Sequence, residues 1–375
     1  MISSDTKWSR TGPGHYQARL VGGTFQFQLD REDLPFQDIC DVAVRDNARR
    51  RFLFVSRVLG RHWPVRPATL RDIAARLADK VALQNQGEPT VFVGMAETAT
   101  TLGQAVFREW RRSGRPGLYI ESTRRLTGGE IAFRFSESHS HATAHVIHLP
   151  NRVDDPQDWF GHARHVAIID DEATTAATAT GLVRAMRAWR RDSPFKATLA
   201  VIVRWRPETE TPCELATVES ITDGRFEFSG ADEFPVAPAP NHGVDSNVIV
   251  RRGVRHGVTE PENIPPHWHG TVARGERILV LGNGEHAFRP LVLAEALEEQ
   301  GAIAWVQAST RSPILLGGAI GHVRQFPALS GEGHAEFLYN VPEDHPYDRV
   351  ILCTEDKPPP ANHPIREIRS LEIRS

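Results

Sequence analysis

Residues 165–178, HVAIIDDEATTAAT, constrain the fold more than any other part of this 375-residue chain. Residues 166–169 are four apolar residues in succession, a pattern typical of a strand that is buried in a parallel sheet. Two carboxylates, Asp170 and Asp171, follow at the end of this strand. Small and hydroxylated residues then lead into an apolar-periodic helix. We therefore predict a buried strand, a short turn and a helix in direct succession.

Such a turn suits the binding of a phosphate group. The N–H groups of the first helical turn point at a bound anion, and the helix dipole favours negative charge there. The candidate phosphate-binding residues are Thr174, Thr175, Ala176, Ala177 and Thr178. The adjacent acids suit ribose hydroxyls or, through water, Mg²⁺. The alternative is a Rossmann-like strand whose acids only cap the next helix.

The composition narrows the class of protein. A chain of 375 residues should hold two domains, because single cores rarely grow past about 250–300 residues. The net charge of −3 argues against nucleic acid or a membrane surface as a partner. The first ten residues lack the apolar core of a signal peptide, and no run is long enough to span a bilayer. Three widely separated cysteines favour a reducing, cytoplasmic location over a disulfide scaffold.

The order of elements predicts an open, mostly parallel α/β sheet. Strands are expected at residues 90–94, 118–120, 166–169 and 198–203, with helices between them and a two-stranded ribbon at 130–135 and 144–148. In such sheets ligands gather at the carboxyl ends of the strands. We therefore expect residues 95–98, 122–125 and 170–178 to lie around one crevice.

The C-terminal part predicts a second, smaller Rossmann-like α/β domain. The proline-rich residues 233–242 indicate a linker. The predicted domains are residues 1–232 with an N-terminal hood, a linker at 233–250, and residues 251–375. Strands are expected at residues 277–281, 302–306 and 350–353, with a helix over residues 291–297.

A glycine-rich turn in the smaller domain invites two interpretations. Gly282-x-Gly284-x-x-Ala287 fits the dinucleotide fingerprint formally, but no acid follows the next strand to hold a ribose. A small-molecule or phosphate pocket fits the turn better, and Arg311 can clamp an anion there. The predicted pocket consists of Gly284, Glu285, Thr310, Arg311 and Ser312. The alternative is a helix cap beside an ordinary surface arginine.

Six motifs in order along residues 30–360 carry a resemblance to a known family. They are Arg45-x-Asn47 with FLFVS (52–56) and LGxH (59–62), FVGMAET (92–98), STRR (122–125), ExHSH (137–141), DDEATT (170–175), and LGxGE (281–285) with TRSP (310–313). The chain resembles phosphoribosyltransferases that carry a C-terminal TRSP domain, of the type found in gene clusters associated with tellurium resistance. It departs from the type I phosphoribosyl-binding loop at Ala176 and Ala177, where glycine is common.

The resemblance implies roles for individual residues. Residues 174–178 would bind the 5-phosphate of phosphoribosyl pyrophosphate (PRPP), and Asp170 and Asp171 would hold the ribose hydroxyls and place Mg²⁺. The implied pyrophosphate loop consists of Met95, Ala96, Glu97 and Thr98. Arg124 and Arg125 would supply positive charge. Glu172 is a weaker candidate for a general base, because it is equally explained as a solvated or helix-capping carboxylate.

The histidines at residues 139–145 leave three interpretations open. His139 and His141 would act as donors or acid–base groups on a lid over the reacting carbon. The alternatives are a metal site, which needs further ligands of matched reach, and an exposed loop without a specific role.

The function implied is a Mg²⁺-dependent transfer from PRPP to an unknown acceptor in a biosynthetic pathway, with release of pyrophosphate. Other enzymes of that pathway are candidate partners, and a second copy of the chain is a candidate partner in a homodimer. The alternative is a non-catalytic sensor of PRPP or a nucleotide, since such folds can be reused as regulators. A third hypothesis makes the second domain the main catalyst.

Overall fold

The computed structural model describes residues 5–45, 52–85, 87–136, 144–206, 212–230, 245–249, 253–329, 333–355 and 357–375. Two compact units are present. The central unit comprises Leu70–Ile221 and His242–Asn263, and the terminal unit comprises Met1–Thr69, Thr222–Asn241 and Ile264–Ser375. These units differ from the boundaries predicted from the sequence, because the first 69 residues group with the C-terminal part of the chain.

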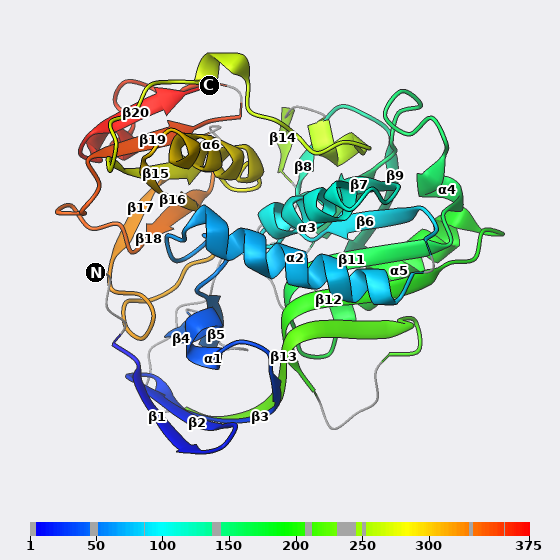
Figure 1. The fold of residues 1–375 in the computed structure, drawn as a ribbon, viewed down its shortest axis with the longest axis horizontal. Coiled ribbons are helices and arrows are strands. Elements are labelled where there is room, and N and C mark those ends of the chain that lie inside the picture. Colours follow the sequence, from blue (N-terminus) through cyan, green and yellow to red (C-terminus); the bar gives the residue numbers. More distant parts are fainter. Residues whose placement is uncertain are drawn as a thin grey trace. The chain divides into compact units, whose positions relative to one another are not determined.

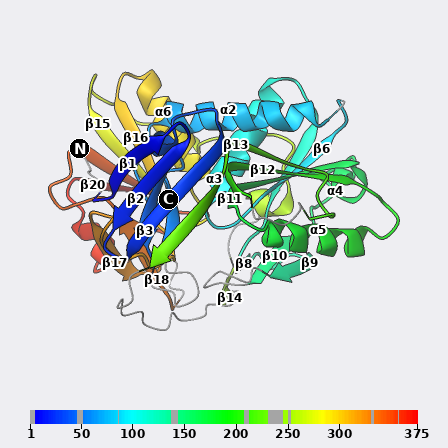
Figure 2. The ribbon, with the colours of Figure 1, turned by 90° about the horizontal axis from the view of Figure 1, so that it is seen from below.

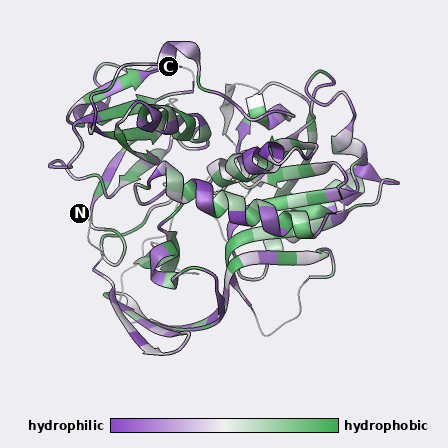
Figure 3. Cartoon of the chain, in the orientation of Figure 1, coloured by the Kyte–Doolittle hydropathy of each residue, from purple (hydrophilic) through white to green (hydrophobic). Residues whose placement is uncertain are grey.

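The central unit is built on four parallel strands. Their order is β12 (Lys196–Trp205), β11 (His165–Ala173), β6 (Thr90–Gly94) and β7 (Gly117–Glu121). Residues 166–169 at the centre are fully buried, and the hydrophobic colouring of these strands in Figure 3 shows the same core. The burial of both sheet faces explains the continuous apolar run. The predicted α/β fold with a mostly parallel sheet is confirmed.

Helices cover both faces of this sheet. Helix α3 (Thr100–Arg112) connects β6 to β7, and α5 (Ala177–Arg190) connects β11 to β12. These crossovers step away from the central pair in opposite directions, so right-handed connections put the two helices on opposite faces. Helix α2 (Pro67–Leu83), which enters the central unit at Leu70, and α5 lie on opposite sides of the strands in Figure 2.

Shorter elements complete the central unit. The ribbon of β9 (Ile131–Ser136) and β10 (Ala144–His148) is antiparallel and packs beside α5. Strand β8 (Arg125–Leu126) pairs with β14 (Asp245–Ile249). Helix α4 (Trp159–His162) is capped by Asp158, whose carboxylate accepts a hydrogen bond from the Gly161 N–H. The 3₁₀ helix η1 (Gly253–His256) follows in the chain.

One part of the terminal unit is an antiparallel meander. It consists of β1 (Lys7–Gly12), β2 (His15–Leu20), β3 (Gly23–Glu32) and, from Thr222 onward, β13 (Thr217–Gly230). Helix α1 (Phe36–Ile39) and the hairpin of β4 (Cys40–Val44) and β5 (Phe52–Ser56) follow β3 in the chain. Aromatic rings form its core: Phe25, Phe27, Phe36, Phe52, Phe54, Phe226 and Phe228.

The other part of the terminal unit is a small parallel sheet (Figure 1). Its strand order is β16 (Ile303–Ala308), β15 (Arg277–Gly282), β19 (Arg349–Cys353) and β20 (Leu371–Arg374), with α6 (Phe288–Glu299) between β15 and β16. Further elements are η2 (Pro266–Trp268), the hairpin of β17 (Val323–Pro327) and β18 (Ala335–Tyr339), and η3 (Pro364–Glu367). The predicted second α/β sheet is present, and β20 extends it beyond the expected strands.

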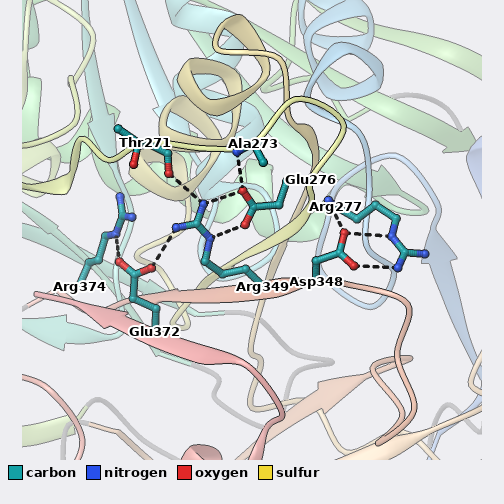
Figure 4. Close-up of polar contacts among 8 residues, drawn as sticks. All are labelled: Thr271, Ala273, Glu276, Arg277, Asp348, Arg349, Glu372 and Arg374. Atoms are coloured by element: carbon teal, nitrogen blue, oxygen red, sulfur yellow. Dashed lines mark hydrogen bonds and ion pairs between the residues drawn. The ribbon is translucent and has the colours of Figure 1, made fainter.

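Ion pairs hold the amino-terminal ends of these strands together (Figure 4). Arg349 on β19 binds Glu276, just before β15, with Nε 2.9 Å from the carboxylate, and lies 3.5 Å from Glu372 on β20. Arg374 binds the same Glu372 at 2.8 Å. The two contacts of Arg349 join neighbouring strands near their amino-terminal ends, whereas the pair of Arg374 and Glu372 lies within β20.

No helix in the described ranges is long and apolar enough to cross a lipid bilayer.

Candidate functional site

The acids predicted to follow the central strand lie within it. Strand β11 continues to Ala173 because Asp170 and Glu172 still pair with β12, opposite Val201 and Val203. The prediction that the strand stops before the acids was therefore wrong. Side chains alternate along a strand, so Asp170 and Asp171 belong to opposite faces. Both are half-buried, and the Asp171 N–H donates to the Asp170 carboxylate at 2.9 Å.

The turn after β11 is open, and several of its donors are available. Thr175 and Ala177 are exposed, whereas Thr174, Ala176 and Thr178 are half-buried. Within the ranges that the structure describes, the N–H groups of Thr174, Thr175, Ala176 and Thr178 donate to no other residue. The carbonyl of Ala176 accepts the hydrogen bond of Thr180 at 2.9 Å, which begins α5. The geometry is therefore that of a helix N-terminus with room for an anion.

Ala176 adopts a left-handed backbone conformation, with φ 54° and ψ 23°. This conformation favours glycine, because the alanine Cβ approaches the following carbonyl oxygen. The sequence has alanine at residue 176, where the related binding loops commonly have glycine. Glycine would adopt this backbone conformation with less strain. Ala177, the other departure, is helical.

The loop after β6 is joined to β11 at Ile169, inside that strand. The Met95 N–H donates to the Ile169 carbonyl at 3.0 Å, and the Ala96 N–H donates to Ser122 Oγ at 2.9 Å. The Ala96–Glu97 peptide bond is cis. Met95 and Ala96 are buried with these amides occupied, whereas Glu97 and Thr98 are half-buried. The Thr98 N–H donates to no residue in the described ranges.

The residues after β7 approach the same loop. The Arg124 guanidinium donates to the Ala96 carbonyl, with 3.4 Å between nitrogen and oxygen, and Arg124 is 7 % exposed. Arg125 is buried as well, with its own N–H bound to Thr123 Oγ1 at 3.0 Å. The structure therefore brings Arg124 to the predicted pyrophosphate loop.

The three predicted groups meet at one edge of the sheet. The connections that leave the neighbouring strands β11 and β6 run in opposite directions, which makes this pair the topological switch point. Ligands of open α/β sheets bind outside the carboxyl ends of the strands at such a point. The loops that follow β11, β6 and β7 leave the sheet at this edge, and the hydrogen bonds given above link the loop after β6 to the loop after β7 and to Ile169 within β11.

His139 and His141 lie outside the described residues, so their assignment to a lid stays a prediction. Their neighbour His145 on β10 is fully buried. Its Nδ1 lies 3.2 Å from Ser122 Oγ, and its ring stacks on Phe135 with the centroids 4.8 Å apart. Ser122 was not singled out from the sequence. It stands in the STRR motif, residues 122–125, which was expected at the crevice, but no role was predicted for its side chain.

The predicted second pocket lies at the carboxyl edge of the small sheet in the terminal unit. Gly284 and Glu285 follow β15, and residues 310–312 follow β16. Glu285 and Arg311 are buried rather than on the surface. Arg61, which is 2 % exposed, donates to the carbonyls of Gly284 at 2.6 Å and Ser309 at 2.8 Å. The sequence does not reveal Arg61, because it is 223 residues away from Gly284.

His62 adds an uncharged polar group to the terminal unit. Its side chain is 5 % exposed, and its Nε2 has no hydrogen-bond partner in the described part of the chain. Burial, together with the positive charges of Arg61 and Arg45, lowers the pKa of His62 to about 3. The imidazole is therefore neutral at physiological pH.

Comparisons with known proteins identify the class. A family model described as phosphoribosyl transferase matches residues 39–222, which include the loops after β6, β7 and β11. A second model, described as the TRSP domain C-terminal to that transferase, matches residues 253–368. The chain belongs to this family of phosphoribosyltransferases with a C-terminal TRSP domain, as its motifs predicted. No curated protein sequence matches the chain.

Solved structures with similar folds include three adenine phosphoribosyltransferases. The Trypanosoma brucei enzyme, in complex with AMP, pyrophosphate and ribose 5-phosphate, is 15% identical with a TM-score of 0.29, and the match covers 42% of this chain and 65% of that one. The Rhodothermus marinus enzyme is 17% identical with a TM-score of 0.33, covering 49% and 93%. The Saccharomyces cerevisiae enzyme is 15% identical with a TM-score of 0.29, covering 41% and 78%.

Proposed function

We propose that the central unit catalyses a Mg²⁺-dependent transfer of the phosphoribosyl group from PRPP to a small-molecule acceptor. Membership of the transferase family supports the reaction class. The observation that carries the assignment of the site is the open turn of residues 174–178, beside two acids and across a switch point from the loop that contains Thr98. These are the groups that a sugar bearing two separate phosphate groups requires.

The roles follow from the chemistry of the transfer. The bond from the anomeric carbon to pyrophosphate breaks with its electron pair on pyrophosphate, the acceptor forms the new bond, and the acceptor's proton goes to a base or to solvent. Positive charge builds on the sugar ring meanwhile, so substrate position and charge stabilisation matter most. Residues 174–178 hold the 5-phosphate, and Asp170 and Asp171 hold the ribose hydroxyls. The Thr98 N–H, the backbone of Glu97 and the Arg124 guanidinium bind the pyrophosphate end.

Mg²⁺ fits this donor set. The ion is usually bound by one or two carboxylates together with substrate phosphates, rather than by a cage of protein ligands alone. In the described ranges, no group of three or more His, Cys, Asp or Glu side chains could hold a metal unaided. Half-buried Asp170 and Asp171 can contribute to such a shared site. When bound, the ion neutralises charge on the leaving pyrophosphate.

Isothermal titration calorimetry of PRPP in the presence of Mg²⁺ tests the site. The Asp171→Asn variant should lose at least about tenfold in affinity, because a charged hydrogen-bond partner contributes roughly 1.5–3 kcal/mol. Asp192→Asn is the matched control, since Asp192 is exposed beyond the far end of α5. Equal affinity of the wild type and Asp171→Asn would remove Asp171 from the site.

The alternative function is a non-catalytic sensor of PRPP. Both a sensor and an enzyme would bind PRPP, so turnover separates them. Release of pyrophosphate from PRPP, measured with small-molecule extracts as the source of acceptor, supports the enzyme. Tight binding with no release under any acceptor mixture supports the sensor.

We also propose that the carboxyl edge of the small sheet binds a small anionic molecule. Buried polar side chains from the ends of β15 and β16, and the hydrogen bonds of Arg61 to the carbonyls of Gly284 and Ser309, support it. Arg311 supplies charge for a carboxylate or phosphate. A thermal-shift screen of phosphorylated and carboxylated metabolites, with Arg311→Gln as the variant, tests this second site. Stabilisation that survives in Arg311→Gln would contradict it.

The cellular setting follows from the same reasoning. We propose a cytoplasmic enzyme of a biosynthetic pathway, with other enzymes of that pathway as its partners. The cysteines Cys40, Cys213 and Cys353 are free thiols, which agrees with a reducing compartment. The resemblance to proteins of tellurium-resistance gene clusters suggests where pathway partners should be sought.

A further inference from the structure

We propose that Ser122 and His145 are positioning residues that set the pyrophosphate loop, through the hydrogen bond from the Ala96 N–H to Ser122 Oγ. The inference rests on the proposed function, because it gives a role to side chains that support the loop rather than touch the substrate. Neither residue belongs to the loop itself, which is residues 95–98.

The backbone of β6 fixes the position of Ser122, and Ser122 in turn fixes the loop after β6. Its own N–H donates to the Gly94 carbonyl at 2.9 Å, at the last residue of β6. Its Oγ then accepts the N–H of Ala96, two residues further along the same chain segment, at 2.9 Å. The side chain is completely buried, so water does not compete for these bonds. Ser122 therefore clamps the start of the loop from two sides.

His145 fixes the direction of the serine hydroxyl. A serine Oγ has one proton and two lone pairs, and one lone pair is taken by the Ala96 N–H. The Nδ1 of His145, 3.2 Å away, is the second partner of the hydroxyl. The imidazole cannot turn easily, because it is fully buried and its ring lies nearly parallel to that of Phe135, at an interplanar angle of 16°.

The backbone reinforces this pair. Thr123, the residue after Ser122, exchanges two hydrogen bonds with Val146, the residue after His145, at 2.9 and 3.0 Å. The serine and the histidine are thus side-chain neighbours on two segments that are already bound together. The ribbon of β9 and β10 is in this way connected to the loop after β6.

The consequence for binding concerns which amides face the ligand. The N–H groups of Met95 and Ala96 donate to Ile169 and Ser122. These two residues therefore shape the loop instead of donating to pyrophosphate. The Thr98 N–H, which donates to no residue in the described ranges, is the amide offered to the ligand. Loss of the serine hydroxyl leaves the Ala96 N–H buried without an acceptor, and the loop shifts to solvate it.

The experiment compares two halves of the substrate by calorimetry. Mg²⁺–pyrophosphate and ribose 5-phosphate are titrated separately into the full-length wild type and the Ser122→Ala, His145→Phe and His145→Asn variants. Ser122→Ala and His145→Phe should weaken pyrophosphate binding about tenfold and change ribose 5-phosphate binding less than twofold. His145→Asn, whose side-chain amide can reach toward the hydroxyl, should restore most of the pyrophosphate affinity. Thermal unfolding of each variant shows whether it is folded.

The outcomes separate this inference from the proposed function. Unchanged pyrophosphate affinity in Ser122→Ala and His145→Phe overturns the positioning role, and so does an equal loss for both ligands, which would mean a general structural role. A wild type that binds neither ligand contradicts the proposed function itself. A Ser122→Ala variant that does not fold leaves the decision to His145→Phe and His145→Asn.

Discussion

Ala176 places a left-handed alanine in the turn that precedes α5. Its left-handed backbone is the conformation that a glycine would adopt without strain, yet the turn keeps its open shape and its donor groups. The alanine methyl group is accommodated within the turn.

Replacement of Ala176 by glycine is therefore predicted not to destabilise the protein. Relief of the left-handed alanine is worth about 1 kcal/mol, and the extra freedom of glycine in the unfolded chain offsets roughly half of that. Ala185→Gly, in the interior of α5, is the control and should cost about 1 kcal/mol. Urea unfolding measures both. A loss for Ala176→Gly as large as for Ala185→Gly would contradict the backbone argument.

His165 gives the protein a defined sensitivity to acid. Its Nδ1 lies 3.1 Å from Thr90 Oγ1 and its Nε2 lies 3.0 Å from Thr198 Oγ1, and burial lowers its pKa from 6.5 to about 4. Between these values the unfolded chain binds a proton that the folded protein does not, so stability falls as the pH falls.

The contribution of His165 to this loss should be about 2 kcal/mol between about pH 7 and about pH 5. His165→Gln removes the titrating group. Its free energy of unfolding should therefore fall less over this interval than that of the wild type, whatever its stability at neutral pH. Parallel pH profiles for the two proteins would show that His165 does not titrate as its burial predicts.

At the residue level, the sequence predicted site residues that stand together in one stretch, but not contacts between residues far apart in the chain. The acids of β11 and the small residues of the turn were recognisable because their chemistry stands in one continuous stretch. Ser122, His145 and Arg61 acquire their roles from partners far away in sequence, and the local motifs around them do not show which partners these are. The end of β11 was misplaced because pairing with β12 carries charged residues into a strand that its apolar run alone would have ended.

At the scale of elements, close contact between β6 and α3 holds the loop between them. A Cβ on Gly103 of α3 would lie 2.9 Å from the Gly94 Cα on β6 and 2.9 Å from the Tyr119 hydroxyl. That hydroxyl donates to the Thr100 carbonyl at 3.1 Å, in the first turn of α3. The helix therefore sits where only glycine allows it, directly behind residues 95–98.

Two glycines in the interiors of helices provide a matched test of this packing. Gly103→Ala should lower the free energy of unfolding by about 1–3 kcal/mol, because backbone blocks the added methyl group. Gly181→Ala in α5 should raise it by about 0.5–1 kcal/mol, because the nearest atom, the Ser136 carbonyl oxygen, would be 3.6 Å away. Chemical denaturation gives both values. Stabilisation by both substitutions would contradict the close approach of α3 and β6.

At the scale of the whole molecule, the two parallel α/β sheets have their candidate site residues at the same position, after the carboxyl ends of the strands. Each has its chemistry-bearing loops at the carboxyl ends of its strands, after β6, β7 and β11 in the central unit and after β15 and β16 in the terminal unit. The sequence predicted both sheets because alternating strands and helices dictate them. It did not predict that residues up to Thr69 group with the C-terminal part, since such grouping depends on long-range packing alone.

The most direct test of the central claim is a crystal structure of the protein with PRPP and Mg²⁺. The 5-phosphate should lie on the N–H groups of residues 174–178, the ribose hydroxyls on Asp170 and Asp171, and the pyrophosphate beside Thr98. PRPP bound elsewhere, or a 5-phosphate that does not contact the turn before α5, would contradict the assignment of this turn as the phosphate site.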